Sequence, residues 1–343
     1  MLEVKKEGVI LRPTNLEFEN KSVFNPGILQ EGNTVHMVYR AIDENNKSCL
    51  GYARLEGPMK VVERWTKPFM YPHFNYEKMG IEDPRLVKIN DLVYMTYVVH
   101  DGKNAMTAYS SGKDLFHLKK GGIISPQLSY NRVGKLFGFS KLKDDYYTFK
   151  SYYTDYVGED VTVWDKDGFF FPEKIKNKYV FMHRILPDTQ IAPAKHIYFL
   201  KTKEYWERNI KQLSKFVVLE PEQGWENRHV GGGCPPIRTK YGWLLIYHGV
   251  GESNDGRIYS AGACILKIDN PTHVIARLPK PFMVPTKKYE TNGTVSDVTF
   301  PTGTAIFDDR LYIYYGTADT NIAVASVNLD EFLEEIMKYP VVD

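Results

Sequence analysis

Two adjacent carboxylates, a proline and an arginine stand together in the segment Glu82-Asp83-Pro84-Arg85. Neighbouring strand residues point to opposite faces, so one site can use both carboxylates only where the backbone turns. Proline fixes its own φ and favours an extended conformation for Asp83. Arg85 is close enough in sequence to keep a carboxylate ionised. The segment therefore predicts a rigid mount for one acid, with a salt-bridged turn as the alternative.

Polar residues also stand at the ends of several apolar, aromatic runs of the chain. The residues concerned are Arg40, His183-Arg184, His248 and Asp319. Each of them alone is typical of an ordinary surface or hydrogen-bonding group. Because the four runs present such groups at the same relative place, we expect these side chains to share one cleft with Asp83.

A third candidate is the pair Arg228-His229, which precedes the glycines 231–233. Glycines bring backbone amides near a ligand or permit tight turns. The segment is not a phosphate loop, because the lysine and Ser/Thr of that motif are missing and two prolines follow instead of a helix. Two interpretations stay open, a ligand-contacting loop and an ordered connection between strands.

The elements that must position these residues are short aromatic strands, most of which follow a turn. The runs cover residues 34–40, 92–99, 146–150, 179–184, 243–248 and 310–315. A turn followed by an aromatic strand is typical of hairpins. Five strand centres, near residues 37, 95, 181, 245 and 313, recur like the units of a repeat. We therefore expect an all-β protein, a five-bladed β-propeller with short peripheral helices in a single domain, 1–343.

Three other segments depart from this repeat. The interval over residues 125–165 is longer than the rest and has room for an extra hairpin, a lid or an oligomerisation element. Residues 203–213 predict a helix between strands. Asn328 is a predicted N-cap, since apolar residues recur after it at helical spacing. Both helices are expected to be packing elements.

Composition excludes several classes of function. The chain has 343 residues, 43% of them hydrophobic, which is ample for a large core. The net charge is +2 and the basic residues are dispersed, so we expect no nucleic-acid or membrane partner. Cys49, Cys234 and Cys264 lack metal-ligand spacing, so neither a disulfide framework nor a metal site is expected. The N-terminal residues lack the apolar run of a signal peptide, and a cytoplasmic protein is expected.

Taken together, these segments resemble glycoside hydrolase family 130, the mannoside phosphorylases and related β-mannosidases. The matching segments occur in the family's order from about residue 23 to 328. They are 23–27, 39–41, 80–85, 171–175, 183–184, 233–237, 242–250, 300–303 and 314–320. The family's fold is a five-bladed β-propeller, in agreement with the strand spacing.

The resemblance implies a mechanism. The family's general acid is the aspartate of Glu-Asp-Pro-Arg, which is Asp83 here. In the family this acid protonates the leaving oxygen through the 3-hydroxyl of the mannosyl unit, while phosphate attacks the anomeric carbon from the opposite face. Configuration inverts, and the product is α-mannose 1-phosphate. Such chemistry needs one protonated carboxyl and a cationic clamp for phosphate.

The family's clamp falls on Lys166, Arg184, His229 and His248, with Arg228 beside His229. Lys166 stands where the family has arginine, and it keeps the charge but loses the bidentate fork. His229 stands where the family has lysine, and it is charged at neutral pH only if its pKa is raised, as bound phosphate could do.

Substrate contacts are expected from residues near the axis of the predicted propeller. The expected set is Asn25, Arg40, Asp43, Glu82, Arg85, Asp297 and Asp319. Asp297 stands where many members carry asparagine and adds a negative charge near the sugar. Glu82 is expected to be a structural or substrate-orienting partner, because phosphorolysis needs no second catalytic carboxylate.

The leading hypothesis is an inverting β-mannoside phosphorylase, a hexosyltransferase acting on β-1,2-mannobiose or β-1,2-mannooligosaccharides. Inorganic phosphate is the co-substrate, and no other cofactor is expected. A β-1,4-mannosyl-glucose or mannooligosaccharide phosphorylase, and a homo-oligomeric assembly, stay open. One alternative is an inverting β-mannosidase, whose base opposite Asp83 could be Glu226 or Glu252. Another is a non-catalytic glycan-binding propeller, which has no need of Asp83 together with cations.

Overall fold

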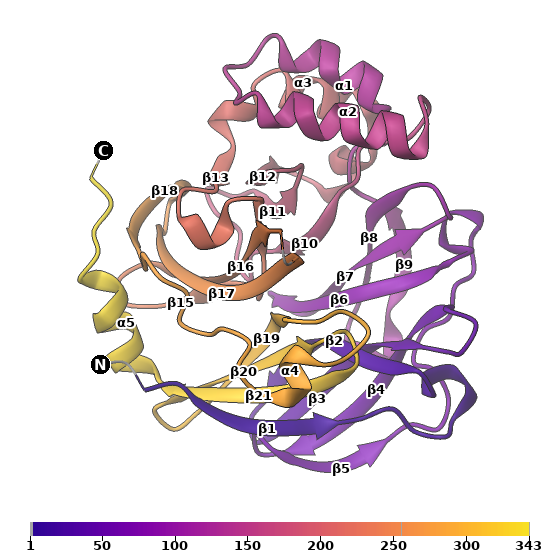
Figure 1. The fold of residues 1–343 in the computed structure, drawn as a ribbon, viewed down its shortest axis with the longest axis vertical. Helices are drawn as coiled ribbons and strands as arrows, with labels where there is room; N and C mark the ends of the chain where they lie inside the picture. Colours follow the sequence, from indigo (N-terminus) through magenta and orange to yellow (C-terminus); the bar gives the residue numbers. More distant parts are fainter. Residues whose placement is uncertain (1–2, 255, 343) are drawn as a thin grey trace.

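Short antiparallel strands build most of the molecule (Figure 1). The computed structural model describes residues 3–254 and 256–342, so residues 1–2 and 343 of the predicted domain lie outside the described residues. The predicted strand centres near 37, 95, 181, 245 and 313 fall in β3, β7, β11, β16 and β20, whose bounds are given below. The all-β prediction is confirmed.

The strands follow one another as four-stranded groups. Group one contains β2 (Ser22–Glu31), β3 (Thr34–Ile42), β4 (Ser48–Glu56) and β5 (Lys60–Arg64). Group two contains β6 (Gly80–Ile89), β7 (Leu92–His100), β8 (Ala105–Gly112) and β9 (Lys119–Ile123). A single parallel pairing, Ser48 with Gly80, joins these two groups into one sheet.

The remaining strands form three separate sheets. Group three contains β10 (Lys166–Phe170), β11 (Tyr179–Arg184), β12 (Thr189–Ala194) and β13 (Val217–Leu219). Group four contains β14 (His229–Gly232), β16 (Trp243–Ser253), β17 (Gly256–Lys267) and β18 (Asn270–Arg277), and β15 (Ile237–Arg238) pairs with β16. Group five contains β19 (Thr299–Phe307), β20 (Arg310–Thr317), β21 (Asn321–Asn328) and the N-terminal β1 (Lys5–Leu11).

Each group shares a buried apolar cluster with the next one. Tyr52 of group one packs with Met95 of group two, and Tyr94 of group two packs in one cluster with Phe181 of group three. Equivalent clusters join groups three and four, and groups four and five. The last cluster joins group five back to group one through Tyr314 and Tyr39. The pairing of β1 with β21 places the first and the last strand of the described residues side by side in group five.

Helices lie at the periphery, as predicted. α1 (Tyr130–Phe137), α2 (Asp145–Val157) and α3 (Lys203–Ile210) gather beside group three in Figure 1. α3 confirms the helix expected within 203–213. The Asn328 cap is confirmed too, because its side chain accepts a hydrogen bond from the Glu331 backbone at the start of α5 (Leu329–Met337). The other helices are α4 (Lys288–Thr291) and single 3₁₀ turns at 17–19, 75–77, 115–117, 197–201, 213–215 and 224–226.

The strand expected over residues 146–150 is wrong, because these residues lie in α2. Their aromatic composition favours a strand, but tertiary packing decides otherwise. Tyr146, Tyr153 and Val157 recur at helical spacing and pack on the apolar cluster shared with group three. The Tyr146 hydroxyl also donates a hydrogen bond of 2.7 Å to the buried Asp188 carboxylate.

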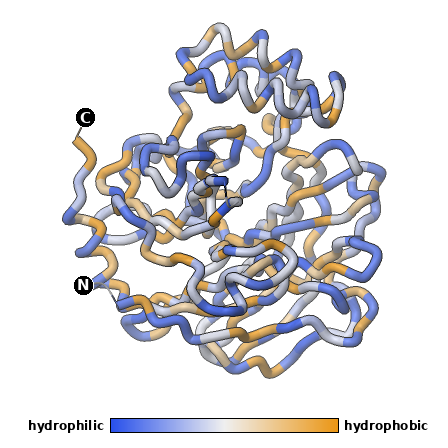
Figure 2. The backbone as a smooth tube through the Cα atoms, viewed as in Figure 1, coloured by the Kyte–Doolittle hydropathy of each residue, from blue (hydrophilic) through white to orange (hydrophobic). Residues whose placement is uncertain are grey.

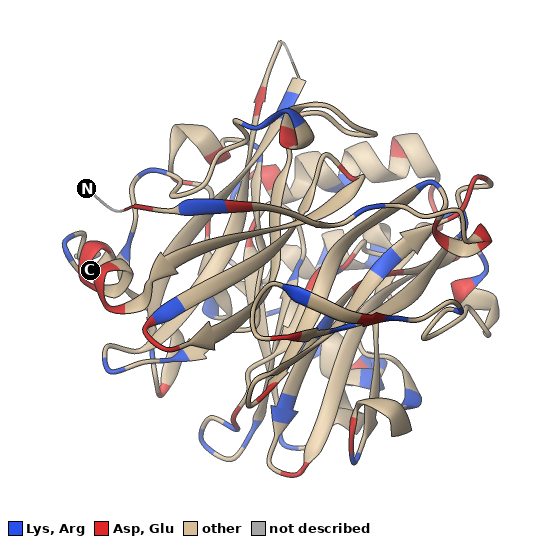
Figure 3. Ribbon diagram, turned by 90° about the horizontal axis from the view of Figure 1, so that it is seen from below, with Lys and Arg blue, Asp and Glu red and all other residues tan. Residues whose placement is uncertain are grey.

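The polar, apolar and charged residues are distributed over the strands and turns of the fold. Figure 2 shows hydrophilic residues at many of the turns and apolar residues along the strands. Figure 3 shows Lys and Arg interspersed with Asp and Glu over strands and turns. Within residues 3–254 and 256–342, no helix is long and apolar enough to cross a membrane.

Candidate active site

The first strands of groups one, two and three share one backbone feature. Asn25, Asp83 and Asp167 adopt left-handed conformations with φ of 49°, 50° and 57°. Each precedes a proline or glycine, and each lies at a register shift in its strand pairing. Asn and Asp tolerate this conformation better than other side chains. The extended conformation expected for Asp83 is therefore wrong. The β-bulge lets the consecutive carboxylates of residues 82 and 83 contact the same group of charged side chains.

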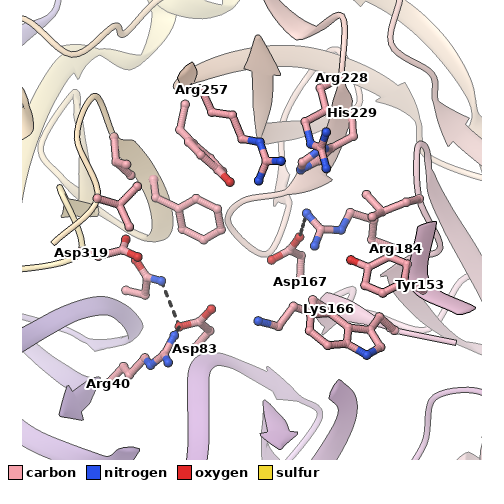
Figure 4. Close-up of a pocket in the computed structure, with 17 residues that line it drawn as sticks. Arg40, Asp83, Tyr153, Lys166, Asp167, Arg184, Arg228, His229, Arg257 and Asp319 are labelled. Carbon is pink, nitrogen blue, oxygen red and sulfur yellow. Dashed lines mark hydrogen bonds and ion pairs between the residues drawn. The ribbon is translucent and has the colours of Figure 1, made fainter. Parts of the chain in front are cut away.

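These bulges line a cavity of about 250 Å³ (Figure 4). The first strand of every group contributes to its wall, through Asn25, Asp83, Lys166 with Asp167, His229 and Phe300. Among the described lining residues, five are Arg or Lys (Arg40, Lys166, Arg184, Arg228, Arg257) and three are Asp (Asp83, Asp167, Asp319). The cavity therefore has a net positive lining and suits a ligand with an anionic part.

Asp83 stands on one side of this cavity. Its Oδ1 accepts a hydrogen bond of 2.9 Å from Asn25 Nδ2 and lies 3.5 Å from Arg40 Nη1. The neighbouring Glu82 is tied to Arg40 at 2.8 Å and to Lys166 at 3.2 Å. Burial raises the pKa of Glu82, but Arg40 and Lys166 outweigh it and lower this pKa to about 2. Glu82 therefore stays ionised and cannot serve as the acid near neutral pH.

Asp319 lies near Asp83 and Arg40, in the hairpin after β20. Burial and the charge of Asp83 raise the pKa of Asp319 to about 6, although Arg40 acts in the opposite direction. Asp319 consequently changes its protonation state close to neutral pH.

A cluster of cations faces Asp83 across the cavity (Figure 4). Arg184 Nη1 lies 2.8 Å from Asp167 Oδ2. Arg228 and Arg257 share the carboxylate of Glu252, at 2.5 and 2.8 Å. Arg184 Nε, Arg228 Nε and His229 Nδ1 are buried and have no hydrogen-bond partner among the described residues. Buried donors without partners are costly, so this cluster is suited to an anion that accepts several hydrogen bonds.

The two histidines of the predicted clamp are neutral. Burial and the charge of Arg184 place the pKa of His229 well below its usual value. Burial also lowers the pKa of His248 to about 3, against the opposing charge of Asp167. His229 lines the cavity, but His248 lies behind it, where it packs on Phe300 at 4.3 Å. Its Nε2 is 3.4 Å from Arg184 Nη1, so it is placed to support Arg184 rather than to contact a ligand.

The glycine run is an ordered strand rather than a ligand loop. Residues 229–232 form β14, which pairs with β16. A Cβ on Gly231 would lie 2.2 Å from His248 Cε1 and 2.6 Å from Asp167 Oδ2. Glycine is therefore needed here because the groups behind Arg184 occupy the space of a side chain.

Four predicted substrate residues lie outside the cavity lining: Glu82, whose ion pairs are given above, and Arg85, Asp43 and Asp297. Arg85 is buried, and it donates to the backbone oxygens of Gly233 at 2.6 Å and Asp83 at 3.1 Å, so it holds the backbone and not a carboxylate. Asp43 accepts from the Lys47 backbone within the turn after β3. Asp297 lines a separate hollow next to Glu252.

Several lining residues escaped the sequence prediction. Asp167 carried a signal, because Asp167-Gly168 follows the pattern of Asn25-Pro26 and Asp83-Pro84. Arg257 sits on the β16–β17 hairpin, where no motif marks it. Tyr153 belongs to the segment that was expected to hold a strand. The other missed lining residues are Trp164, Leu186, Tyr259, Val295, Val298 and Phe300.

The described residues contain no group of three or more His, Cys, Asp or Glu placed to hold a metal ion. The three cysteines are unpaired and buried.

Comparisons with known proteins identify the fold and the family. A protein of Thermoanaerobacter sp. (strain X514) named 1,2-beta-oligomannan phosphorylase is 30% identical over 96% of this chain and 99% of its own length. The structure of a beta-1,2-mannobiose phosphorylase from Listeria innocua, in complex with beta-1,2-mannobiose, matches 98% of this chain and 99% of that chain, with a TM-score of 0.72 and 23% identity.

A third match covers 96% of this chain and 94% of that chain, with a TM-score of 0.73 and 20% identity. It is described as showing that the GH130 family of mannoside phosphorylases contains hydrolases that target beta-1,2 mannosidic linkages in Candida mannan. A family model for glycoside hydrolase family 130, described as beta-1,4-mannooligosaccharide phosphorylase, matches residues 6–338. The chain therefore belongs to glycoside hydrolase family 130.

Proposed function

We propose that this protein catalyses the inverting phosphorolysis of β-1,2-linked mannosides, releasing α-mannose 1-phosphate and a shortened sugar. The observation that carries the proposal is the juxtaposition, in one cavity, of Asp83 with Arg184, Arg228 and His229, each of which has a buried side-chain nitrogen without a hydrogen-bond partner among the described residues. An acid on one side and an anion-binding cluster on the other are what attack by phosphate requires.

In this reaction a phosphate oxygen forms the new bond to the anomeric carbon, and the bond to the leaving sugar oxygen breaks. Asp83 gives up its proton to the 3-hydroxyl of the mannosyl unit, which passes its own proton to the leaving oxygen. Asn25 and Arg40 hold the Asp83 carboxyl in place. Arg184 and His229 bind phosphate, and Asp167 orients Arg184. Phosphate brings its own negative charge, so this mechanism calls for no cofactor.

The hydrolytic alternative needs a carboxylate base, and neither predicted candidate is well placed. Glu226 is fully buried, accepts from the backbone of residues 222 and 223, and lies 2.6 Å from Arg277 Nη2. Glu252 is shared between Arg228 and Arg257. Asp167 does line the cavity. Burial raises the pKa of its carboxyl, but the charge of Arg184 outweighs burial and lowers this pKa, which makes Asp167 a weak base. These contacts favour phosphate over water as the nucleophile.

The β-1,2 linkage is the preferred choice because the relative that matches nearly the whole chain is named for it. The description of the matching family model names β-1,4-mannooligosaccharides, so the β-1,4 linkage is the second candidate. A purely glycan-binding role is not favoured, since binding needs no cluster of unpartnered cationic donors.

We further propose that the five strand groups are the blades of one five-bladed β-propeller domain. The closed series of apolar clusters, from group one through group five and back, supports this arrangement. So does the cavity, which takes its lining from the first strand of every group. We also propose a cytoplasmic location, because a sugar phosphate is useful inside the cell. We propose that the protein forms a homo-oligomer, which sedimentation would test.

The decisive experiment is incubation of the protein with β-1,2-mannobiose, with and without inorganic phosphate. We expect α-mannose 1-phosphate, identified by phosphorus and proton NMR, and no free-mannose release above background without phosphate. Phosphate-independent release of mannose would establish the hydrolase instead, and binding without turnover would establish the glycan-binding protein. β-1,4-mannobiose and mannosyl-glucose in parallel reactions decide the linkage.

A further inference from the structure

A second hollow, of about 590 Å³, adjoins the cavity. Four residues line both spaces, Tyr153, Trp164, Arg228 and Arg257. The part outside the cavity is lined by Tyr152, Tyr156 and Lys103, among others. We call this hollow the tyrosine groove. Because the two spaces share these four side chains, the groove lies beside the position that a ligand in the cavity would occupy.

Two tyrosines of α2 stack on each other in the tyrosine groove and leave exposed ring surface there. The rings of Tyr152 and Tyr156 lie 5.8 Å apart with an angle of 5° between their planes. Their side chains are 45% and 80% exposed, so the tyrosines are not buried by the chain's own packing. Exposed aromatic rings beside a binding cavity mark an interaction surface, and a ring face suits the apolar face of a pyranose.

The surface is held rigidly by the rest of the molecule. Tyr153, between the two exposed tyrosines, stacks on Tyr130 at 5.2 Å and contacts Trp164 at 4.8 Å. Trp164 Nε1 donates to the Lys103 backbone at 3.1 Å. At the start of α2, Tyr146 is hydrogen-bonded to Asp188. A surface that is ordered before the ligand arrives loses less conformational entropy on binding.

The groove meets the cavity next to the acid-bearing strand. Trp164 is two residues from Lys166, which is paired with Glu82. The His100 ring contacts Trp164 at 5.8 Å, and His100 pairs with Gly80 of the strand that carries Asp83. The groove therefore adjoins both the neighbourhood of the acid-bearing strand and the cation cluster.

We propose that the tyrosine groove binds the sugar units of a β-mannooligosaccharide beyond the two that flank the cleaved bond. The inference rests on the proposed function and adds a preference for substrates of three or more units. Tyr152 and Tyr156 stack on these units, and Lys103 and Arg257 are placed to bind their hydroxyl groups.

The test compares β-1,2-mannobiose with β-1,2-mannotetraose in the Tyr152→Ala/Tyr156→Ala double variant. We expect kcat/KM for the tetraose to fall about 10-fold, as for loss of an aromatic contact, and kcat/KM for mannobiose to change less than about twofold. The Tyr152→Phe/Tyr156→Phe variant keeps both ring faces and should keep the preference. Tyr198→Ala is the matched control, because Tyr198 is also highly exposed (68%) and does not line the groove.

Equal losses for both substrates, or no loss for either, would overturn the proposal. Calorimetric measurement of mannotetraose binding without phosphate tests the groove independently of the proposed phosphorolysis. Weaker binding in the alanine double variant supports the groove even if no phosphorolysis is found, and unchanged binding rejects it. If sedimentation shows that the alanine variant loses a subunit contact while tetraose binding is unchanged, the surface joins two copies of the chain and the proposal fails.

Discussion

Replacing Arg184 with alanine tests the phosphate-binding cluster at its centre. The side chain is only 12% exposed, and its Nη1 lies 2.8 Å from Asp167 Oδ2. Its Nε is buried without a partner among the described residues. The substitution therefore removes donors from the cavity and also leaves the buried Asp167 carboxylate without its closest cation.

The expected losses of phosphate binding and of folding stability follow from the two kinds of contact that Arg184 makes. A hydrogen bond to a charged group contributes about 1.5–3 kcal/mol. If Nε and one terminal nitrogen both bind phosphate, the loss is about 3 kcal/mol or more, which corresponds to roughly 100-fold in the phosphate KM. Breaking a buried ion pair costs about 3–5 kcal/mol of folding free energy. Stability and phosphate binding therefore have to be measured separately.

The assay varies phosphate at saturating β-1,2-mannobiose, then mannobiose at saturating phosphate, with thermal unfolding of each variant followed by circular dichroism. The Arg184→Ala/Asp167→Asn double variant removes the unpaired carboxylate and should recover much of the lost stability. Its phosphate KM should nevertheless stay about 100-fold above wild type. Arg184→Lys should be intermediate, since lysine keeps the charge but not the planar fork.

One result would refute the reasoning. A phosphate KM within about threefold of wild type, in a folded double variant, would remove Arg184 from phosphate binding. Equal increases in the KM values for phosphate and sugar would mean that the substitution distorts the whole cavity.

Three further substitutions test other parts of the site and the fold. Asp83→Asn should lower phosphate-dependent turnover about 10³-fold, as for loss of a general acid, while the protein stays folded because Arg40 keeps its pairing with Glu82; near-normal turnover would show that another group is the acid. Because burial raises the pKa of Asp319 to about 6, its carboxylate is ionised as pH rises from 5 to 7 and accepts stronger hydrogen bonds, so the mannobiose KM should fall about fivefold over this range. The Asp319→Asn variant should show no such change, and the same pH dependence in both proteins would contradict this role. Burial raises the pKa of Asp188 in the folded state to about 7, above its value in the unfolded state. Between these two pKa values the unfolded state gives up the proton more readily, so the folded state becomes less stable as pH rises toward 7. Asp188→Asn should therefore raise the unfolding free energy by on the order of 2 kcal/mol at pH 8 and hardly at all at pH 4, as measured by urea denaturation.

The strands could be predicted because their signals are local. β3, β7, β11, β16 and β20 each combine a preceding turn with aromatic and β-branched residues, which needs no knowledge of distant contacts. α2 shows the limit of such reasoning. Its residues 146–150 favour a strand by composition, but their packing against group three and the contact of Tyr146 with Asp188 are long-range and select a helix.

The site shows the same division. Asp83, Arg184 and His229 were found through motifs, and the structure brings them to one cavity. Arg85 lies in the strongest motif yet holds the backbone, because position in a sequence motif does not tell which way a side chain points. Arg257 reaches the cavity from the start of β17, and only the folded chain brings this residue close to the others.

Backbone conformation also explains why short side chains carry the chemistry at this site. Asn25, Asp83, Asp167 and Asp319 all adopt left-handed conformations, each of which costs on the order of 1–3 kcal/mol for a residue with a Cβ. Glycine would relieve the strain but provide no functional group, and longer side chains tolerate the conformation less well. The bulge turns a side chain toward the cavity at a position where regular alternation would not. An aspartate at position 83 is therefore the carboxylic acid that both the reaction and the backbone accept, whereas a glutamate would meet only the chemical requirement.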